Sequence, residues 1–224
     1  MKVTLISHSQ ALSSKAYDQG WMGIEDMIAY CARVSNPSNQ NNRATSHKLL
    51  RYLIKHKHWS PFEMVSICLE IETTRDIGRQ ILRHRSFSFQ EFSQRYADPT
   101  KDLDFETRKA RLQDLKNRQN SIEMADDNEV INEFYVIQAN VLRTAKDAYE
   151  WAIRNSIAKE QARAVLPEGM TKSRMYMNGT LRSWMHYIDL RSTNGTQKEH
   201  MEIARACGEA IKPIFPMIED FVHD

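Results

Sequence analysis

The segment Val65-Ser66-Ile67-Cys68-Leu69-Glu70-Ile71-Glu72 carries the clearest β-strand pattern in this sequence. Apolar residues alternate with small or polar ones, so the two kinds of side chain point to opposite faces of a strand. Only one face is apolar enough to join a core. The pattern therefore indicates an antiparallel sheet covered on one side, because strands of a doubly wound parallel sheet are apolar on both faces.

Other segments supply further strands and several helices. Residues 1–7 and 174–178 are expected to form two more strands. Apolar spacing predicts helices over 24–34, from Ser46 (as N-cap) to 54, 74–82, 137–164 (with Val141 buried), 181–190 and from 197 to a break at Pro213. The charged segment 98–133 is expected to form an exposed helix plus a loop. We therefore predict an α+β fold: a single domain over residues 1–224, with a mainly antiparallel sheet flanked by helices.

The composition excludes several classes of protein. The chain has 224 residues, a formal net charge of +2 and seven glycines, and its glycine usage is about half the average of roughly 7%. The glycines never form G-x-G-x-x-G or G-x-x-x-x-G-K-[ST], so the fingerprints of a Rossmann turn and a P-loop are absent. The near-balanced charge argues against a general nucleic-acid binder. A bound nucleotide would therefore have to be held by side chains.

No targeting or membrane segment is expected. The opening residues MKVTLISHSQ are too short and too polar for the apolar core of a signal peptide. No stretch approaches the roughly 20 apolar residues of a membrane span. Cys31, Cys68 and Cys207 are widely spaced, which favours a reducing compartment over a disulfide scaffold. We expect a soluble cytoplasmic protein whose cysteines are small buried residues, because no neighbour in sequence would lower a thiol pKa.

Two basic segments are candidate anion sites. Arg83, His84 and Arg85 stand together at the expected end of a helix, and guanidinium groups suit phosphate or carboxylate. The alternative is that these basic residues offset the helix dipole. In the second segment, Arg182 and His186 are four residues apart on a helix, so both can reach one ligand.

The histidines do not indicate a metal site. His56 and His58 are two residues apart, a spacing that suits a strand but not one face of a helix. No cysteine or aspartate follows at structural-zinc spacing. We expect no bound metal, and a solvated helix end at His56.

The first basic segment lies within the motif of a known family. Arg83-His84-Arg85, followed by seven residues and Ser93, matches R-H-R-x7-S, the motif that names the flavin-dependent thymidylate synthases. Further blocks resemble those of the family in the same order: residues 32–35, 58–63, 162–167 and 181–191, then Gln197 and Glu199. The chain departs from the usual pattern at Met64, Gln90 and Thr180. Because the blocks cover most of residues 30–205, the sequence strongly resembles this family.

The resemblance implies an activity. The family makes thymidylate from deoxyuridylate, taking a methylene from methylenetetrahydrofolate and a hydride from FAD that NADPH has reduced. Its members are typically homotetramers whose active sites are shared by several subunits. For this chain the resemblance implies the same substrates, cofactors and assembly, with no nucleic-acid and no membrane partner.

The resemblance also implies roles for individual residues. Arg191 would lie beside the uracil ring and favour ionisation of N3, an electrostatic activation that needs no cysteine nucleophile. The residues implied to contact FAD are Ser35, His58, Ser60, Arg83, His84, Arg85, Glu91, Thr180, Arg182 and His186. Those implied to hold deoxyuridylate are Gln80, Arg83, Glu91, Ser93, Gln94, Arg95, Arg163 and Arg191. Ser93 is expected to position the substrate, because an unassisted serine hydroxyl is a weak nucleophile.

Two alternatives remain open on sequence grounds. The R-H-R segment and the nearby Phe87, Phe89 and Phe92 could belong to an RNA- or DNA-binding module, whose affinity would fall steeply with salt. A flavin-binding homologue that has lost methyl transfer would carry the same motifs. NADPH oxidation measured with and without deoxyuridylate and folate separates that homologue from an active synthase.

Overall fold

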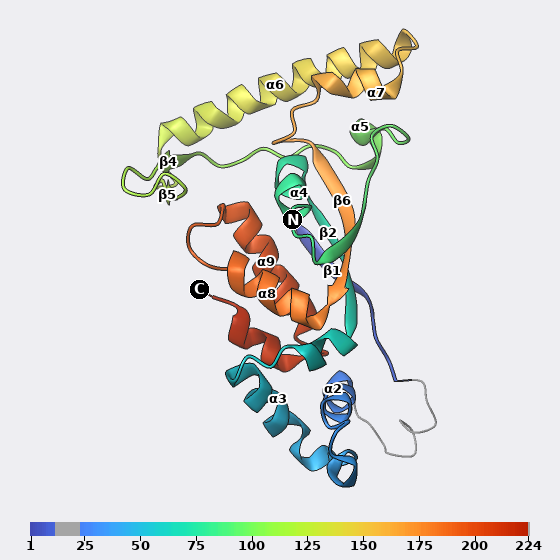
Figure 1. Cartoon of the computed structure of the whole chain (residues 1–224). Coiled ribbons are helices and arrows are strands. Elements are labelled where there is room, and N and C mark those ends of the chain that lie inside the picture. Colours follow the sequence, from blue (N-terminus) through green and yellow to red (C-terminus); the bar gives the residue numbers. More distant parts are fainter. Residues whose placement is uncertain (12–22, 224) are drawn as a thin grey trace.

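The structure is a computed structural model that describes residues 1–11 and 23–223. Its centre is a four-stranded antiparallel sheet with the strand order β1-β2-β6-β3 (Figure 1). The strands are β1 (Lys2–His8), β2 (Ser66–Thr74), β6 (Lys172–Thr180) and β3 (Phe87–Glu91). The predicted α+β class with an antiparallel sheet and flanking helices is confirmed.

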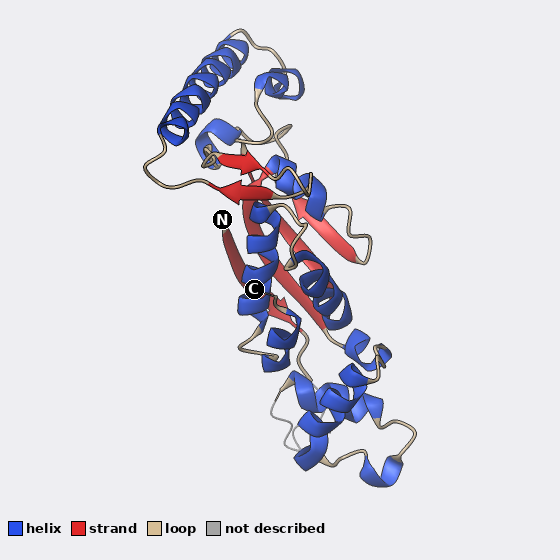
Figure 2. Ribbon diagram, turned by 90° about the vertical axis from the view of Figure 1, so that its left-hand side faces the viewer, coloured by secondary structure: helices blue, strands red, loops and turns tan. Residues whose placement is uncertain are grey.

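Helices flank the sheet on one face and at both ends. They are α2 (Ile24–Ala32), α3 (Ser46–Lys55), α4 (Arg75–Ile81), α5 (Pro99–Asp102), α6 (Glu129–Arg154), α7 (Lys159–Ala162), α8 (Leu181–Arg191) and α9 (Lys198–Ile211). Short 3-10 turns are η1 (Pro37–Asn39), η2 (Arg43–Thr45), η3 (Ser60–Met64), η4 (Arg163–Val165) and η5 (Pro216–Phe221). Figures 1 and 2 show α2 and α3 at one end of the sheet and α6 at the other. Within the described ranges, no helix is long and apolar enough to cross a membrane.

The strand β2 supplies the centre of the core. Ile67, Leu69 and Ile71 are fully buried, whereas Cys68 and Glu70, on the opposite face, are only half-buried. The buried face packs against α8 and α9, and each such aliphatic side chain contributes about 1.5–3 kcal/mol on burial. This face therefore anchors α9 and α8, and α8 carries the candidate site residues Arg182, His186 and Arg191.

The strand β3 was not predicted, and it fixes the turn that carries the R-H-R motif. Phe87 pairs with Gly179 of β6. A Cβ atom at Gly179 would lie 2.4 Å from Cδ1 of Phe87, so the ring can lie against β6 only because residue 179 is glycine. The Phe87 ring also meets Trp184 and Tyr187 of α8 edge to face, with ring centroids 4.8 and 5.9 Å apart. The turn 82–86 between α4 and β3 is thus held against α8.

The expectation of an exposed helix within 98–133 is wrong. After the short α5, the chain is extended and then forms a hairpin of β4 (Arg111–Gln113) and β5 (Ser121–Glu123). Side chains bond to the backbone there: the Asp98 carboxylate accepts from the N–H of Thr100 at 3.0 Å, and the Asp114 carboxylate from that of Lys116 at 2.8 Å. Such bonds favour caps and turns over a continuous helix.

The long helix α6 differs in position from the prediction. It runs from Glu129 to Arg154 rather than from 137 to 164, and its N-cap Asn128 accepts from the N–H of Val130 at 3.0 Å. Its C-terminal half packs in a small cluster around Tyr149. Val141, predicted to be buried, is 45% exposed, because the N-terminal half of α6 lies away from the main core (Figure 1).

Candidate active site

The R-H-R turn meets the C-terminal end of α8. Nε–H of Arg191, the last residue of α8, donates to Nε2 of His84 at 3.0 Å. The His84 ring stands edge to face against Tyr187, one turn earlier on α8, with centroids 4.9 Å apart. Two residues predicted to lie in the active site, 107 positions apart in sequence, are therefore in direct contact.

The electrostatics of this contact keep His84 uncharged. Burial, with the positive charges of Arg191 and Arg83, lowers the pKa of His84 from its ordinary value of 6.5 to about 4. A neutral imidazole has one nitrogen with a free lone pair, which here accepts from Arg191. The Nη groups of Arg191 have no partner among the described residues, so they are free to meet an anionic ligand.

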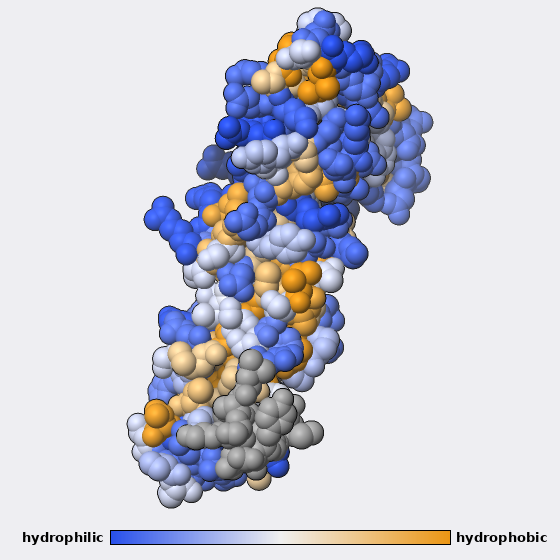
Figure 3. Space-filling model, turned by 90° about the vertical axis from the view of Figure 1, so that its right-hand side faces the viewer, coloured by the Kyte–Doolittle hydropathy of each residue, from blue (hydrophilic) through white to orange (hydrophobic). Residues whose placement is uncertain are grey.

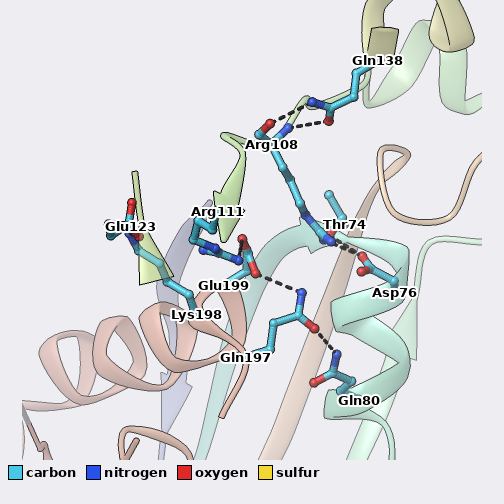
Figure 4. Close-up of polar contacts among 10 residues, drawn as sticks. All are labelled: Thr74, Asp76, Gln80, Arg108, Arg111, Glu123, Gln138, Gln197, Lys198 and Glu199. Carbon is cyan, nitrogen blue, oxygen red and sulfur yellow. Dashed lines mark hydrogen bonds and ion pairs between the residues drawn. The ribbon is translucent and has the colours of Figure 1, made fainter. Parts of the chain in front are cut away.

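Gln80, on α4, lies next to this pair. Its Oε1 is 3.3 Å from Nδ1 of His200, and its Nε2 donates to Oε1 of Gln197 at 2.7 Å (Figure 4). His200 is fully buried on α9, and its ring lies 6.1 Å from that of His84. Gln80, His84 and Arg191, all predicted site residues, are thus gathered around α8 and α9.

A second group of predicted residues lines a separate hollow of about 280 Å³. Gln94 is 3% exposed, and its Nε2 has no hydrogen-bond partner in the described structure. Arg163 of η4 borders the same hollow and has no ion-pair partner among the described residues. A buried orphan amide donor costs about 1–3 kcal/mol. Together with a free guanidinium, it points to an anion as the missing partner.

Two arginines of α4, Arg75 and Arg79, also border this hollow, and acidic residues balance part of its charge. Arg75 lies 3.7 Å from carboxylate oxygens of Glu91 and of Glu168. Glu91 also accepts from the Ser173 hydroxyl at 2.9 Å. Glu91 therefore contacts Arg75, which borders this hollow, and in the described structure it makes no polar contact with the Arg191–His84 pair.

A third group lies at the N-terminal end of α8. Arg182 donates to the Glu63 carboxylate of η3 at 2.5 Å, and the His186 ring stands edge to face against Trp59 at 4.8 Å. His58 and Ser60 flank Trp59 and are exposed. The resemblance assigned four of these residues to the flavin, and the structure brings them to one surface.

The other predicted residues take individual places. Arg83 and Arg85 are exposed on the turn 82–86, without an ion-pair partner among the described residues. Arg95 pairs with Glu160 at 3.4 Å.

The Thr180 hydroxyl accepts from the N–H of Ser183 at 3.2 Å as N-cap of α8. Among the described residues, the one hydrogen-bond partner of Ser93 Oγ is the backbone N–H of Arg95, at 3.4 Å. Ser35 is exposed after α2, apart from the groups above.

The cysteines do not form an activated thiol. Burial raises the pKa of Cys31, Cys68 and Cys207 above the ordinary value, which disfavours the thiolate. Cys207 is fully buried as predicted, whereas Cys31 and Cys68 are half-buried. Within residues 1–11 and 23–223, no group of three His, Cys, Asp or Glu side chains is placed to hold a metal ion.

His200 and Tyr187 are not among the predicted site residues. Tyr187 is 1% exposed, and its hydroxyl lies 3.1 Å from Nε2 of His200. One signal was present: His200 interrupts the apolar face of α9 that includes Ile203, Ala204 and Cys207. A polar side chain on such a face needs a partner, and that partner can be found only in the folded chain.

Comparison with known proteins first defines the class of fold. The structure is similar to the crystal structure of the UMP/dUMP methylase PolB from Streptomyces cacaoi, with a TM-score of 0.76. The match covers 98% of this chain and 93% of the other at 24% sequence identity. The chain thus has the α+β fold of that methylase.

Sequence comparison then gives the family. Residues 19–217 match the family described as "Thymidylate synthase complementing protein". The chain is 46% identical to a "Probable flavin-dependent thymidylate synthase" of Paramecium bursaria Chlorella virus 1, covering 92% of this chain and 93% of the relative. It is 50% identical to the flavin-dependent thymidylate synthase of a Synechocystis species, over 87% of each. The chain belongs to the flavin-dependent thymidylate synthase family and is an enzyme, as predicted.

Proposed function

We propose that this enzyme makes thymidylate by reductive methylation of deoxyuridylate, with methylenetetrahydrofolate as carbon donor and FAD, reduced by NADPH, as hydride source. The names of its relatives support the activity. The observation that carries the proposal is the guanidinium of Arg191, whose Nε–H is held by a neutral His84 and whose Nη groups have no partner in the described part of the chain.

Arg191 is the catalytic residue in this proposal. Carbon C5 of uracil is a weak nucleophile, and it becomes stronger when negative charge develops on the ring. A fixed guanidinium beside N3 stabilises that charge without forming a bond. The raised pKa values of Cys31, Cys68 and Cys207 are consistent with an activation that uses no thiol. Ser93, with no imidazole or carboxylate at its Oγ in the described structure, positions the substrate.

The hollow beside Gln94 and Arg163 fits the phosphate of deoxyuridylate. A phosphate oxygen would accept from the orphan Nε2 of Gln94, and the free guanidinium of Arg163 would neutralise its charge. Within one chain, Gln94 and Arg163 border this hollow, whereas Gln80 and Arg191 do not. We propose that Gln80, Arg83, Glu91, Ser93 and Arg95 complete the nucleotide site.

The residues proposed for FAD fit a dinucleotide that carries a negatively charged pyrophosphate. Arg83 and Arg85 are exposed and lack an ion-pair partner in the described structure, and His84 lies between them. We propose that these residues hold FAD, with Ser35, His58, Ser60, Glu91, Thr180, Arg182 and His186. When bound, FAD supplies the hydride that completes the methyl group. No glycine-rich backbone turn is needed, because side chains make these contacts.

We further propose a homotetramer in which subunits share active sites, each being one domain of residues 1–224. The separation of Gln94 and Arg163 from Arg191 supports sites completed by a second copy. Val130, Phe134, Ile137 and Val141 form an exposed apolar row on α6, a surface that such an assembly can cover. Figure 3 shows further apolar patches between hydrophilic ones. We expect the enzyme to act in the cytoplasm, with no nucleic-acid or membrane partner.

Two measurements on the purified protein test this function. Flavin absorption should be present and be released on denaturation. Thymidylate should form from deoxyuridylate only when methylenetetrahydrofolate and NADPH are both supplied. A protein that takes up no added FAD would contradict the proposal. A flavoprotein that oxidises NADPH but forms no thymidylate would instead be a homologue without methyl transfer.

A further inference from the structure

A chain of hydrogen bonds links the β4–β5 hairpin to Gln80 (Figure 4). Nη2 of Arg111, on β4, donates to Oε1 of Glu199 at 2.7 Å. Nε2 of Gln197 donates to Oε2 of Glu199 at 2.9 Å, and Nε2 of Gln80 donates to Oε1 of Gln197 at 2.7 Å. The side chains of Arg111 and Glu199 are only 16% exposed, so water competes little for these bonds.

The negative charge of Glu199 fixes which group is the donor in each of these hydrogen bonds. Burial alone would raise the pKa of Glu199, but bonds from its own backbone N–H and from Gln197, with the charge of Arg111, hold the pKa below its ordinary value. A carboxylate can only accept hydrogen bonds. Gln197 must therefore turn its NH2 group to Glu199 and its oxygen to Gln80. Gln80 must in turn give its NH2 group to Gln197.

Beyond Gln80, the series of hydrogen bonds continues into the core, and each donor again points toward Glu199. Oε1 of Gln80 lies 3.3 Å from Nδ1 of His200, and Nε2 of His200 lies 3.1 Å from the Tyr187 hydroxyl. Burial and nearby positive charge lower the pKa of His200 to about 3, so the ring is neutral and carries one proton. Burial raises the pKa of Tyr187 well above its ordinary value, so its hydroxyl keeps its proton. Nδ1–H of His200 therefore donates to Gln80, and the Tyr187 O–H donates to Nε2.

We propose that Glu199 is a positioning residue that, through Gln197, fixes which way round the Gln80 amide faces, and so which donor and acceptor Gln80 offers to deoxyuridylate. This inference rests on the proposed function, in which Gln80 contacts the nucleotide. The hydrogen bonds to Gln197 and His200 use one N–H and one lone pair of the Gln80 amide. A second N–H and a second lone pair remain for the substrate, and the orientation of the amide determines where they point.

The substitution Glu199→Gln should exchange donor and acceptor in every hydrogen bond between residue 199 and Tyr187. Arg111 has only donors, so the new amide must keep its oxygen toward Arg111 and turn its NH2 group to Gln197. Two NH2 groups cannot bond to each other, so Gln197 flips, and then Gln80 flips. His200 must then present a bare Nδ1 and carry its proton on Nε2. The substitution changes neither the shape of residue 199 nor the residues that touch the substrate.

The tautomer of His200 reports this reversal directly. Long-range proton–nitrogen correlation spectra of FAD-loaded enzyme labelled with nitrogen-15 histidine should show Nδ1–H in the parent protein and Nε2–H in Glu199→Gln. The His200 signals are assigned by their loss in His200→Asn. Glu202→Gln is the matched control: Glu202 lies on the same helix but takes no part in this series of hydrogen bonds, so the tautomer should stay unchanged. An unchanged Nδ1–H tautomer in Glu199→Gln would overturn the inference.

Calorimetric binding of deoxyuridylate to the FAD-loaded enzyme tests the link to the substrate. Glu199→Gln should weaken binding about tenfold. In the Gln80→Ala background the same substitution should cause no further loss, because it acts only through Gln80. Gln197→Leu interrupts the series of hydrogen bonds without a change of charge. It should also weaken binding, and it should cause no further loss in the Gln80→Ala background. A loss that adds to that of Gln80→Ala overturns this inference alone, whereas a parent enzyme that binds no deoxyuridylate overturns the proposed function and this role together.

Discussion

Nε–H of Arg191 donates a hydrogen bond to Nε2 of His84 at 3.0 Å, and this bond joins the end of α8 to the turn between α4 and β3. It leaves the two Nη groups of Arg191 for a ligand, on the side chain that carries the proposed catalysis. Because His84 is held neutral, it can accept this bond and orient the guanidinium.

Arg191→Lys should greatly slow thymidylate formation while FAD stays bound. A lysine ammonium has no planar fork and cannot bond His84 and the uracil ring in one fixed geometry. Loss of such an electrostatic group typically lowers kcat by about 10²–10³-fold. The measurements are thymidylate production and the ratio of FAD to protein after gel filtration. Loss of FAD together with activity would reassign Arg191 to cofactor binding.

Arg154→Lys is the matched control for this substitution. Arg154 ends α6 on the surface, where it lies 3.7 Å from Glu150 in an exposed pair of little energetic weight. The control should retain both FAD and activity. If it loses activity as Arg191→Lys does, the effect at residue 191 is not specific to the site.

Gln94→Leu should weaken deoxyuridylate binding while leaving the protein as stable or slightly more stable. The buried Nε2 of Gln94 has no partner in the described structure, so its removal relieves a desolvation cost of about 1 kcal/mol. If phosphate is its partner, affinity should fall about tenfold, as for one charge-assisted hydrogen bond. Urea unfolding and calorimetric binding measure the two effects. A stable variant with unchanged affinity would contradict the phosphate site.

Gln138→Leu is the contrasting variant. Gln138 is also buried, but its amide accepts from the N–H of Arg108 and donates to the C=O of Arg108, both at 2.8 Å (Figure 4). Removal of this amide leaves two backbone groups unpaired and should destabilise the fold by about 2 kcal/mol. Opposite signs of the stability change in the two variants would separate a functional amide from a structural one.

The sequence predicts the sheet well because the alternation in β2 is local and periodic. It predicts the R-H-R turn as a site because three basic residues and the family motif are contiguous. β3 was missed although Phe87 and Phe89 alternate with Ser88 and Gln90. That alternation is too short to identify a strand without its partner β6.

The contacts that define the site could not be predicted, because they join residues far apart in sequence. Arg191 and His84 are 107 positions apart, and His200 and Gln80 are 120 apart. No periodic pattern encodes such pairs, since they depend on how α4, α8 and α9 pack. The hairpin β4–β5 shows the same limit, because capping and turn bonds outweighed the helical appearance of a charged segment.

Gly179→Ala should destabilise the enzyme and disturb the R-H-R turn. The added methyl group would lie 2.4 Å from Phe87, which must then leave its place against β6. Such overpacking costs about 1–3 kcal/mol, and displacement of Phe87 should also weaken FAD binding by the adjoining turn. Gly23→Ala is the control, because a Cβ there meets nothing within 4 Å. Equal free energies of unfolding for both variants would contradict the close packing.

Half-buried His84 and buried His200 should make the enzyme lose stability as the pH falls below about 6.5. The folded state holds the pKa of His84 at about 4 and that of His200 at about 3, both below their ordinary value of 6.5. Between pH 6.5 and about 4 the unfolded chain therefore binds more protons than the folded chain. The contribution of these two histidines to the free energy of unfolding is therefore at its full value above pH 6.5, and it decreases as the pH falls through this window.

His200→Asn tests this dependence at one position. An asparagine amide keeps an N–H donor toward Gln80 but does not titrate, so the slope of unfolding free energy against pH between 6.5 and 4.5 should fall by about 1.4 kcal/mol per pH unit, the value for one proton. Urea unfolding at a series of pH values measures the slope. A parent protein whose stability does not fall between pH 6.5 and 4.5 would show that His200 is not held neutral by its burial.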